Sequence, residues 1–144
     1  MYKTIVRERT HMAEKELILI SHGKMAEGVK ASAELIMGEQ EHVHTVCLLP
    51  SEGPEDFKQK FENEIAGMDV ADITVFADLM GGTPANVVSR MIMGGQKIHL
   101  ISGMNLPLVI EWLNSQMNGV ESDYITAGKA GMVDVTEMLA KMNK

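Results

Sequence analysis

Residues 16–38 read ELILISHGKMAEGVKASAELIMG and predict a β-strand that leads directly into an α-helix. The run Glu16–Ile20 is short, apolar and rich in β-branched isoleucine, which is typical of a buried strand. From Lys24 to Met37 the apolar residues return at helical spacing, and Gly38 supplies a C-terminal stop. The apolar face of this predicted helix consists of Met25, Val29, Ala33 and Ile36.

The same order of strand and helix repeats along the chain. Further strands are expected at residues 42–49, 71–77 and 98–102. Further helices are expected at residues 54–66, 84–93 and 107–113, each with a proline in or near its first turn. Repeated alternation of this kind predicts parallel strands joined by right-handed crossovers. We therefore predict an α/β fold, a doubly wound three-layer sandwich with a mostly parallel sheet in the strand order 2-1-3-4.

The C-terminal residues allow two interpretations. In the first, residues 121–130 form a short helix and residues 132–136 (MVDVT) form an antiparallel strand at the edge of the sheet. In the second, residues 123–126 form the strand and the rest is helical. We favour the first interpretation.

Composition places the chain among globular proteins. It has 144 residues, of which 45% are apolar and 23% are charged, and this is enough for one domain with a substantial core. No apolar run is long enough to span a bilayer, and no signal peptide is recognisable. The single cysteine, Cys47, excludes an internal disulfide and is typical of a reducing compartment. We therefore expect a cytoplasmic protein.

The first residues differ in character from the rest. Residues 1–11 carry three basic residues and one acidic residue, and the join at Thr10-His11-Met12 resembles vector-derived sequence. We interpret residues 1–11 as an expression tag and residues 12–144 as a single domain; a natural N-terminal extension is the alternative. Removing the tag removes a net charge of +2, so the formal charge changes from −7 to −9. An acidic surface argues against nucleic acid and favours a basic or neutral protein partner.

Unusual residues follow three of the predicted strands. Ser21-His22-Gly23 comes after the first strand, residues 78–86 (DLMGGTPAN) after the third, and residues 102–107 (SGMNLP) after the fourth. Chemistry in open parallel sheets collects at the carboxyl ends of strands, beside the point where the strand order reverses. Because strands one and three are neighbours in the predicted order, His22 and Asp78 are expected to face each other across one crevice.

His22 is the candidate nucleophile of this crevice. An imidazole titrates near neutrality, so a neutral nitrogen is available to attack phosphorus, and phosphohistidine passes its group on readily. Asp78 is expected to accept a hydrogen bond from the other ring nitrogen, which fixes the tautomer and stabilises the charged ring. Alone, the histidine is better interpreted as an ordinary core or loop residue, and the aspartate as a helix N-cap. The pairing of the two favours catalysis.

The segment Gly81-Gly82-Thr83-Pro84 is a candidate phosphate site. Two glycines let backbone N–H groups approach an oxyanion, and the helix that follows has a positive N-terminus. The Thr83 hydroxyl is expected to bind a phosphoryl oxygen, to cap the helix, or to do both at different stages. The chain has neither a Walker lysine nor a G-x-G-x-x-G sequence after the first strand, so nucleotide binding is not supported and no cofactor is expected.

The three segments resemble the signature blocks of the mannose-type enzyme IIA family of sugar phosphotransferase systems, in the order and spacing of that family. The resemblance spans residues 13–144. It implies a phosphohistidine at His22, oriented by Asp78, and a phosphate pocket built from Gly82 and Thr83. It also implies a homodimer in which a C-terminal edge strand swaps between the subunits.

The resemblance implies protein partners as well. A member of this family accepts phosphate from phospho-HPr and passes it to an enzyme IIB domain or subunit during sugar uptake, and it meets the membrane only through the permease subunits. The chain ends at Lys144 without a linker or an enzyme IIB domain, so we expect a free-standing IIA subunit. The sugar is not recorded in such a chain, because the IIA domain never contacts it.

Three of the thirteen methionines fall in loops expected around His22. Most of the others are expected to fill gaps in the core. Met25, Met80 and Met104 are expected to form an apolar collar against which both partners press, because methionine side chains adapt to different surfaces. Ordinary core packing is the alternative. Met80 stands where the family often has an aromatic residue; this departure leaves the implied chemistry intact but blurs the inference of partner and sugar specificity.

Three other functions compete with a phosphoryl carrier. A chelatase that inserts a metal into a tetrapyrrole also has His-Gly after its first strand, but the second ligand set it needs is not found. A histidine phosphatase needs an arginine before the histidine, where this chain has Ser21. A regulatory module that senses phosphorylation uses the same phosphohistidine, so the sequence leaves it open. No metal site is expected, since none of the remaining histidines has Cys or carboxylate neighbours at ligand spacing: His11, His42, His44 and His99.

Overall fold

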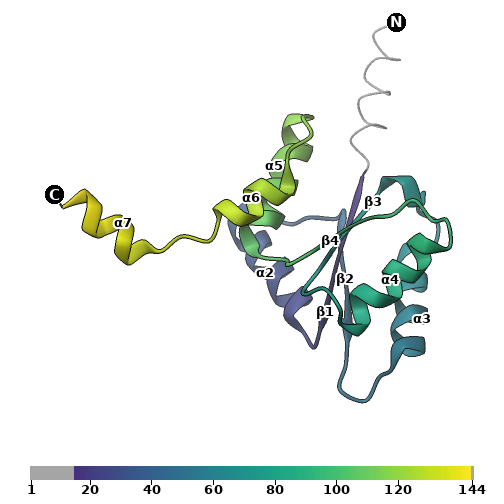
Figure 1. The fold of residues 1–144 in the computed structure, drawn as a ribbon. Helices are drawn as coiled ribbons and strands as arrows, with labels where there is room; N and C mark the ends of the chain where they lie inside the picture. The colour runs from purple at the N-terminus through teal and green to yellow at the C-terminus, as the bar shows by residue number, and fades with distance from the viewer. Residues whose placement is uncertain (1–14, 144) are drawn as a thin grey trace, which may run out of the picture.

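The structure is a computed structural model that describes residues 15–143, and it contains one parallel sheet with helices on both of its faces (Figure 1). The strands are β1 (Glu16–His22), β2 (Val43–Leu48), β3 (Ile73–Ala77) and β4 (His99–Ser102). They lie in the order β2-β1-β3-β4, and each neighbouring pair is parallel. The predicted tag, residues 1–11, lies outside the described residues.

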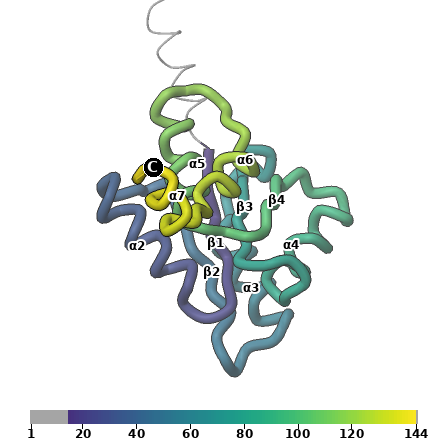
Figure 2. The backbone as a smooth tube through the Cα atoms, turned by 60° about the vertical axis from the view of Figure 1, so that its left-hand side comes forward, coloured from purple at the N-terminus to yellow at the C-terminus, as the bar shows by residue number. Residues whose placement is uncertain are grey.

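The helices divide between the two faces of the sheet. One face is covered by α2 (Met25–Met37), α5 (Leu106–Asn118) and α6 (Tyr124–Ala130), and the other by α3 (Pro54–Ile65) and α4 (Thr83–Met93). A short 3-10 helix, η1 (Val70–Asp72), leads into β3. Figure 2 shows α2 and α4 on opposite sides of the strands. Between residues 15 and 143, no helix combines the length and the hydropathy that crossing a bilayer requires.

β1 is a central strand that is buried on both faces. Leu17 and Leu19 enter the apolar cluster beneath α2 and α5, while Ile18 and Ile20 enter the cluster beneath α3 and α4. All four side chains are fully buried. A strand covered on both faces is apolar at every position, which is why the sequence of β1 does not alternate. The buried run ends at the carboxyl end of β1, where His22, the last residue of the strand, is exposed.

The predicted edge strand at residues 132–136 is wrong. After α6 the next element is helix α7 (Val135–Met142), and residues 15–143 contain no antiparallel strand. Local helix signals explain the difference. The Asp134 carboxylate caps α7 by accepting the backbone N–H of Glu137 at 3.0 Å, and Lys141 pairs with the Glu137 carboxylate at 3.1 Å one turn later.

Helix α7 stands apart from the rest of the fold (Figure 1). Its apolar residues recur at helical spacing and are all exposed: Val135, Met138, Leu139 and Met142. Helix α6, in contrast, packs closely on α5. The backbone of Gly131, just after α6, lies so near the Pro107 side chain at the start of α5 that a Cβ on Gly131 would overlap it. Close backbone packing therefore ends at Gly131, and the residues that follow carry an apolar face that the described chain leaves uncovered.

Candidate active site at the carboxyl edge of the sheet

The carboxyl ends of β1 and β3 bring His22 and Asp78 together. His22 is the last residue of β1, and Asp78 follows β3 directly. The backbone N–H of Asp78 donates to the carbonyl of Ile20 at 3.1 Å, so pairing between the two strands continues up to the candidate site. The two side chains, which the strand order predicted to face each other, are in contact.

Both oxygens of the Asp78 carboxylate are hydrogen-bonded. Oδ2 accepts the backbone N–H of His22 and also lies 2.8 Å from Nδ1 of the His22 ring. Oδ1 accepts the backbone N–H of Leu79 at 2.9 Å. The Asp78 side chain is only 8% exposed, whereas that of His22 is 45% exposed. A nearly buried carboxylate therefore holds an imidazole that is accessible from outside.

The charge state of Asp78 follows from these contacts. Burial tends to raise the pKa of the carboxyl, but the hydrogen bonds from the backbone and ring of His22, and from the backbone of Leu79, outweigh it and hold the pKa below its usual range. An ionised carboxylate can only accept hydrogen bonds, so Nδ1 of His22 carries the proton. In the neutral ring, Nε2 is then the nitrogen with a free lone pair.

The ring of His22 lies directly against the backbone of Gly82. A Cβ added to Gly82 would overlap Cε1 of the ring and lie 2.9 Å from Nε2. The φ angle of Gly82 is −89°, which any residue can adopt. Glycine is needed here because of the close approach of the imidazole, and this approach places Nε2 at the start of α4.

Gly81, Gly82 and Thr83 form the turn that opens α4. Gly81 has a φ angle of +88°, which favours glycine, and Thr83 is the first residue of the helix. The side-chain amide of Asn86 donates to the carbonyl of Gly81 at 3.3 Å and closes the turn. The first N–H groups of a helix have no acceptor within the helix, so this turn presents donors and a positive dipole beside the imidazole.

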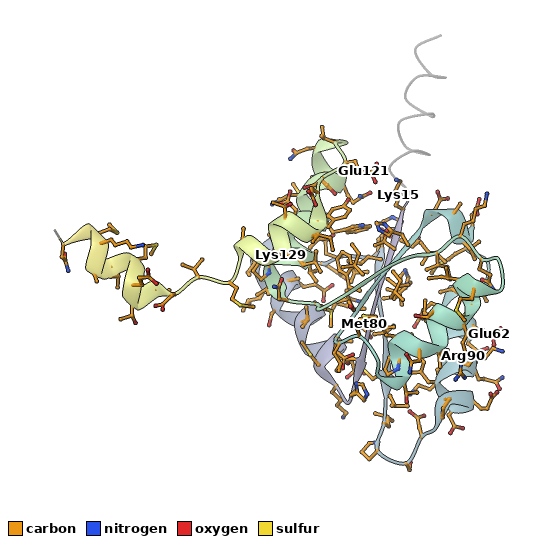
Figure 3. All side chains as sticks on the ribbon, viewed as in Figure 1. Lys15, Glu62, Met80, Arg90, Glu121 and Lys129 are labelled. Atoms are coloured by element: carbon orange, nitrogen blue, oxygen red, sulfur yellow. The ribbon has the colours of Figure 1, made fainter. Side chains whose placement is uncertain are left out.

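The three predicted collar methionines do not share one environment. Met25, at the start of α2, is 45% exposed, and Met80 is 84% exposed on the loop between β3 and α4 (Figure 3). Met104 is only 4% exposed and belongs to the core cluster beneath α5. Its backbone N–H donates to the carbonyl of Ala77 at 2.9 Å, which folds the loop back onto the sheet. The predicted collar is therefore wrong at Met104.

Two leucines extend the exposed apolar rim instead. Leu79, beside Met80, is 50% exposed, and Leu49, just after β2, is 38% exposed. Neither leucine was singled out from the sequence, although Leu49 is the last residue of the predicted second strand and Leu79 lies two residues beyond the third, so both were expected at the same edge as His22. We call Met25, Leu49, Leu79 and Met80 the apolar rim.

Two other histidines lie at the opposite end of the sheet. Nδ1 of His42 and Nε2 of His44 contact the two carboxylate oxygens of Glu16, at 2.9 and 2.8 Å. His99 is exposed at the start of β4. No cluster of three or more His, Cys, Asp or Glu side chains within residues 15–143 is arranged to hold a metal ion.

The chain also matches a known family of proteins. Residues 16–126 match the model of the family described as the PTS system fructose IIA component. The chain belongs to this family. The matched region contains every residue of the site described above, and helix α7 lies outside it.

Individual members of this enzyme IIA family agree with the match. The mannose-specific EIIAB component of Escherichia coli is 30% identical over 77% of this chain; the alignment covers 35% of that protein, so this chain spans about a third of its length. The fructose-specific EIIA component of Bacillus subtilis is 25% identical over 79% of each chain. The crystal structure of EIIA from Streptococcus agalactiae has a TM-score of 0.75 at 30% identity, over 85% of this chain and 98% of that one. None of these comparisons favours a tetrapyrrole chelatase.

Proposed function

We propose that this enzyme IIA chain is a phosphoryl carrier of a bacterial sugar phosphotransferase system. It accepts phosphate from phospho-HPr on Nε2 of His22 and passes it to an enzyme IIB domain or subunit. The observation that carries the proposal is the contact between Nδ1 of His22 and Asp78, which leaves Nε2 free beside Gly82 at the start of α4. The sugar is handled by the permease, so its identity does not enter this site.

The transfer step uses the groups described above. The lone pair of Nε2 forms a bond to phosphorus while the bond between phosphorus and HPr breaks, and the His22 ring becomes positively charged. The Asp78 carboxylate stabilises this charge through Nδ1–H. The backbone N–H groups at the start of α4 and the Thr83 hydroxyl bind the phosphoryl oxygens. Onward transfer reverses these changes and restores the neutral ring.

The helix N-terminus contributes without fixing the phosphate too tightly. An anion near a helix N-terminus is stabilised by about 0.3–1 kcal/mol at an exposed site. A relay needs a group that leaves as readily as it arrives, and His22 is half exposed rather than enclosed. The apolar rim around His22 gives both partner proteins a surface to press against and displaces water during transfer.

We also propose that the chain forms a homodimer through its C-terminal residues. The exposed apolar side chains after Gly131 lie on one segment that extends away from the rest of the described chain (Figure 1). Isolated apolar residues on a surface need no explanation, but a continuous apolar face marks an interaction site. A second copy of the chain is the partner that the family resemblance implies.

The experiment is incubation with phosphoenolpyruvate, enzyme I and HPr, followed by mass mapping of the phosphate. We expect label on His22 in the unaltered chain and none in His22→Ala, with an unchanged melting temperature because His22 lies at the open edge of the sheet. His42→Ala is the matched control, since His42 is 46% exposed and also contacts a carboxylate, at the other end of the sheet. Label on His42 or His99 in the His22→Ala variant contradicts the assignment.

A further inference from the structure

We propose that Ser21 is a positioning residue for His22: its hydroxyl closes the turn around His22 and so holds the imidazole against Asp78 and Gly82. This inference rests on the proposed role of His22 as phosphoryl acceptor. Ser21 stands out because it is polar and yet fully buried, directly before the most exposed residue of β1. Buried hydroxyls are kept only where they are hydrogen-bonded, so the contacts of this one show what it organises.

The Ser21 hydroxyl makes two hydrogen bonds to backbone groups on the far side of His22. It donates to the carbonyl of Gly23 at 3.0 Å, and it accepts the backbone N–H of Ala26 at 2.8 Å. Lys24, which precedes α2, makes no capping hydrogen bond with its own side chain. Ser21 therefore performs the capping of α2 from the end of β1, and its bond to Gly23 spans His22.

Both neighbours of His22 are thereby fixed. Ser21 is paired with Cys47 in the sheet, and the backbone N–H of Gly23 donates to the carbonyl of Leu48 at 2.7 Å. Gly23 has a φ angle of +58°, so the chain turns sharply just after the histidine. The backbone of His22 is thus anchored to β2 on one side and to α2 on the other.

The orientation of this backbone decides the position of the ring. The His22 backbone N–H and ring Nδ1 share a single acceptor, Oδ2 of Asp78, each at 2.8 Å. A rotation of the peptide between Ser21 and His22 moves both donors relative to that oxygen. Without the hydroxyl, the buried N–H of Ala26 and the carbonyl of Gly23 lose their partner, and the turn relaxes to satisfy them elsewhere. The Asp78 contact, which selects the tautomer of His22, then weakens.

The test is the Ser21→Ala variant, with the tautomer of His22 read from the ¹⁵N chemical shifts of its ring. We expect the unaltered protein to be almost entirely protonated on Nδ1 at a pH where the ring is neutral. In Ser21→Ala we expect a mixture of the two tautomers, and phosphoryl transfer from HPr slowed about tenfold, less than the roughly 10²-fold that a misplacement of about 1 Å costs.

Ser115→Ala is the matched control. Ser115 is also buried, and its hydroxyl bonds the carbonyl of Trp112 at 2.7 Å and the Tyr124 hydroxyl at 2.9 Å, within α5 and α6. Both variants are expected to lower the melting temperature, but only Ser21→Ala should change the ring shifts of His22. Unchanged shifts in Ser21→Ala, or the same change in Ser115→Ala, would overturn the inference.

Two features keep the test decisive. If Ser21→Ala does not fold, Ser21→Cys retains the size of the side chain with a weaker donor, and it is measured with a reductant because Cys47 is its strand partner. A mixture of tautomers in this variant supports the inference, and wild-type shifts contradict it. The ring shifts do not depend on phosphorylation, so a chain that never accepts phosphate would refute the proposed function while leaving the positioning role of Ser21 measurable.

Discussion

A single carboxylate oxygen, Oδ2 of Asp78, holds both the backbone and the ring of His22. Substitution of Asp78 is therefore a direct test of the pairing. Asp78→Asn keeps the size of the side chain but offers an amide that can donate to Nδ1, which favours the wrong tautomer and removes the charge opposite the phosphorylated ring. Loss of the carboxylate in a catalytic triad slows catalysis about 10⁴-fold.

For Asp78→Asn we expect a smaller loss, about 10–10³-fold in the rate of phosphoryl transfer, because backbone donors at α4 still act on the phosphate. Rapid-quench measurement of transfer from phospho-HPr gives this rate. Asp123→Asn is the control: Asp123 also has a lowered pKa, through its hydrogen bonds with Thr126, but it caps α6 away from the site. Equal rates for Asp78→Asn and the unaltered chain would rule out the pairing.

Gly82 is the second residue at which a substitution has a specific expected effect. In Gly82→Ala the new Cβ overlaps the His22 ring, so the ring must move, while the backbone angle of Gly82 suits alanine. We expect transfer to fall about 10²-fold, the effect of a misplacement near 1 Å, with little change in melting temperature. Gly28→Ala, in α2, meets no atom within 4 Å and serves as the control. Normal transfer in Gly82→Ala would mean that the ring does not lie where the geometry places it.

At the residue scale, sequence reasoning reached His22 and Asp78 because each follows a predicted strand and the two strands are neighbours. It did not reach Ser21, because a serine at the end of a strand has no distinctive pattern. Its importance comes from burial and from two hydrogen bonds that only the folded turn creates. Gly82 was predicted from the sequence as part of a phosphate site, but its close approach to the imidazole was not, because that approach depends on side-chain placement rather than on spacing.

At the scale of elements, hydrophobic periodicity predicted the strands and helices whose apolar residues pack in the core. It failed at residues 132–136, where a local helix cap decided the structure. The strands are buried runs bounded by turn residues, and the helices α3, α4 and α5 begin at or next to a proline. The MVDVT segment alternates over only five residues, too few to outweigh the helix cap at Asp134. The prediction for Met104 was wrong for another reason. It took a loop residue to be exposed, but this loop folds back and buries the Met104 side chain in the core.

The apolar rim is the element-scale surface to test. In a Met25→Ser, Met80→Ser double variant we expect transfer from HPr and transfer to enzyme IIB both to slow, because both partners are proposed to press against the same rim. The melting temperature should change little, since both methionines are exposed. Met93→Ser is the matched control: Met93 is 81% exposed, at the far end of α4. A large drop in melting temperature with normal kinetics would assign the methionines to the core.

At the scale of the whole molecule, the uncovered face of α7 is the surface that the proposed homodimer would use. Truncation after Gly131 removes the exposed apolar residues of the C-terminal segment but keeps the close packing of α6 on α5. We expect the full chain to sediment as a dimer and the truncated chain to be monomeric or to aggregate. A truncated chain that sediments as a stable dimer contradicts a role for this segment in assembly, and a full chain that stays monomeric at high concentration contradicts the dimer itself.

The central position of β1 has a consequence for how the molecule opens. Its side chains supply both apolar clusters, and its backbone pairs with β2 on one side and β3 on the other. Neither apolar cluster can persist without β1, so we expect the layers on the two faces of the sheet to unfold as one cooperative unit. The amides from Leu17 to Ser21 should then exchange with solvent only when the entire domain opens. The imidazole of His22 directly follows this segment, so we expect fluctuations of the surrounding loops to leave the strand that carries it undisturbed.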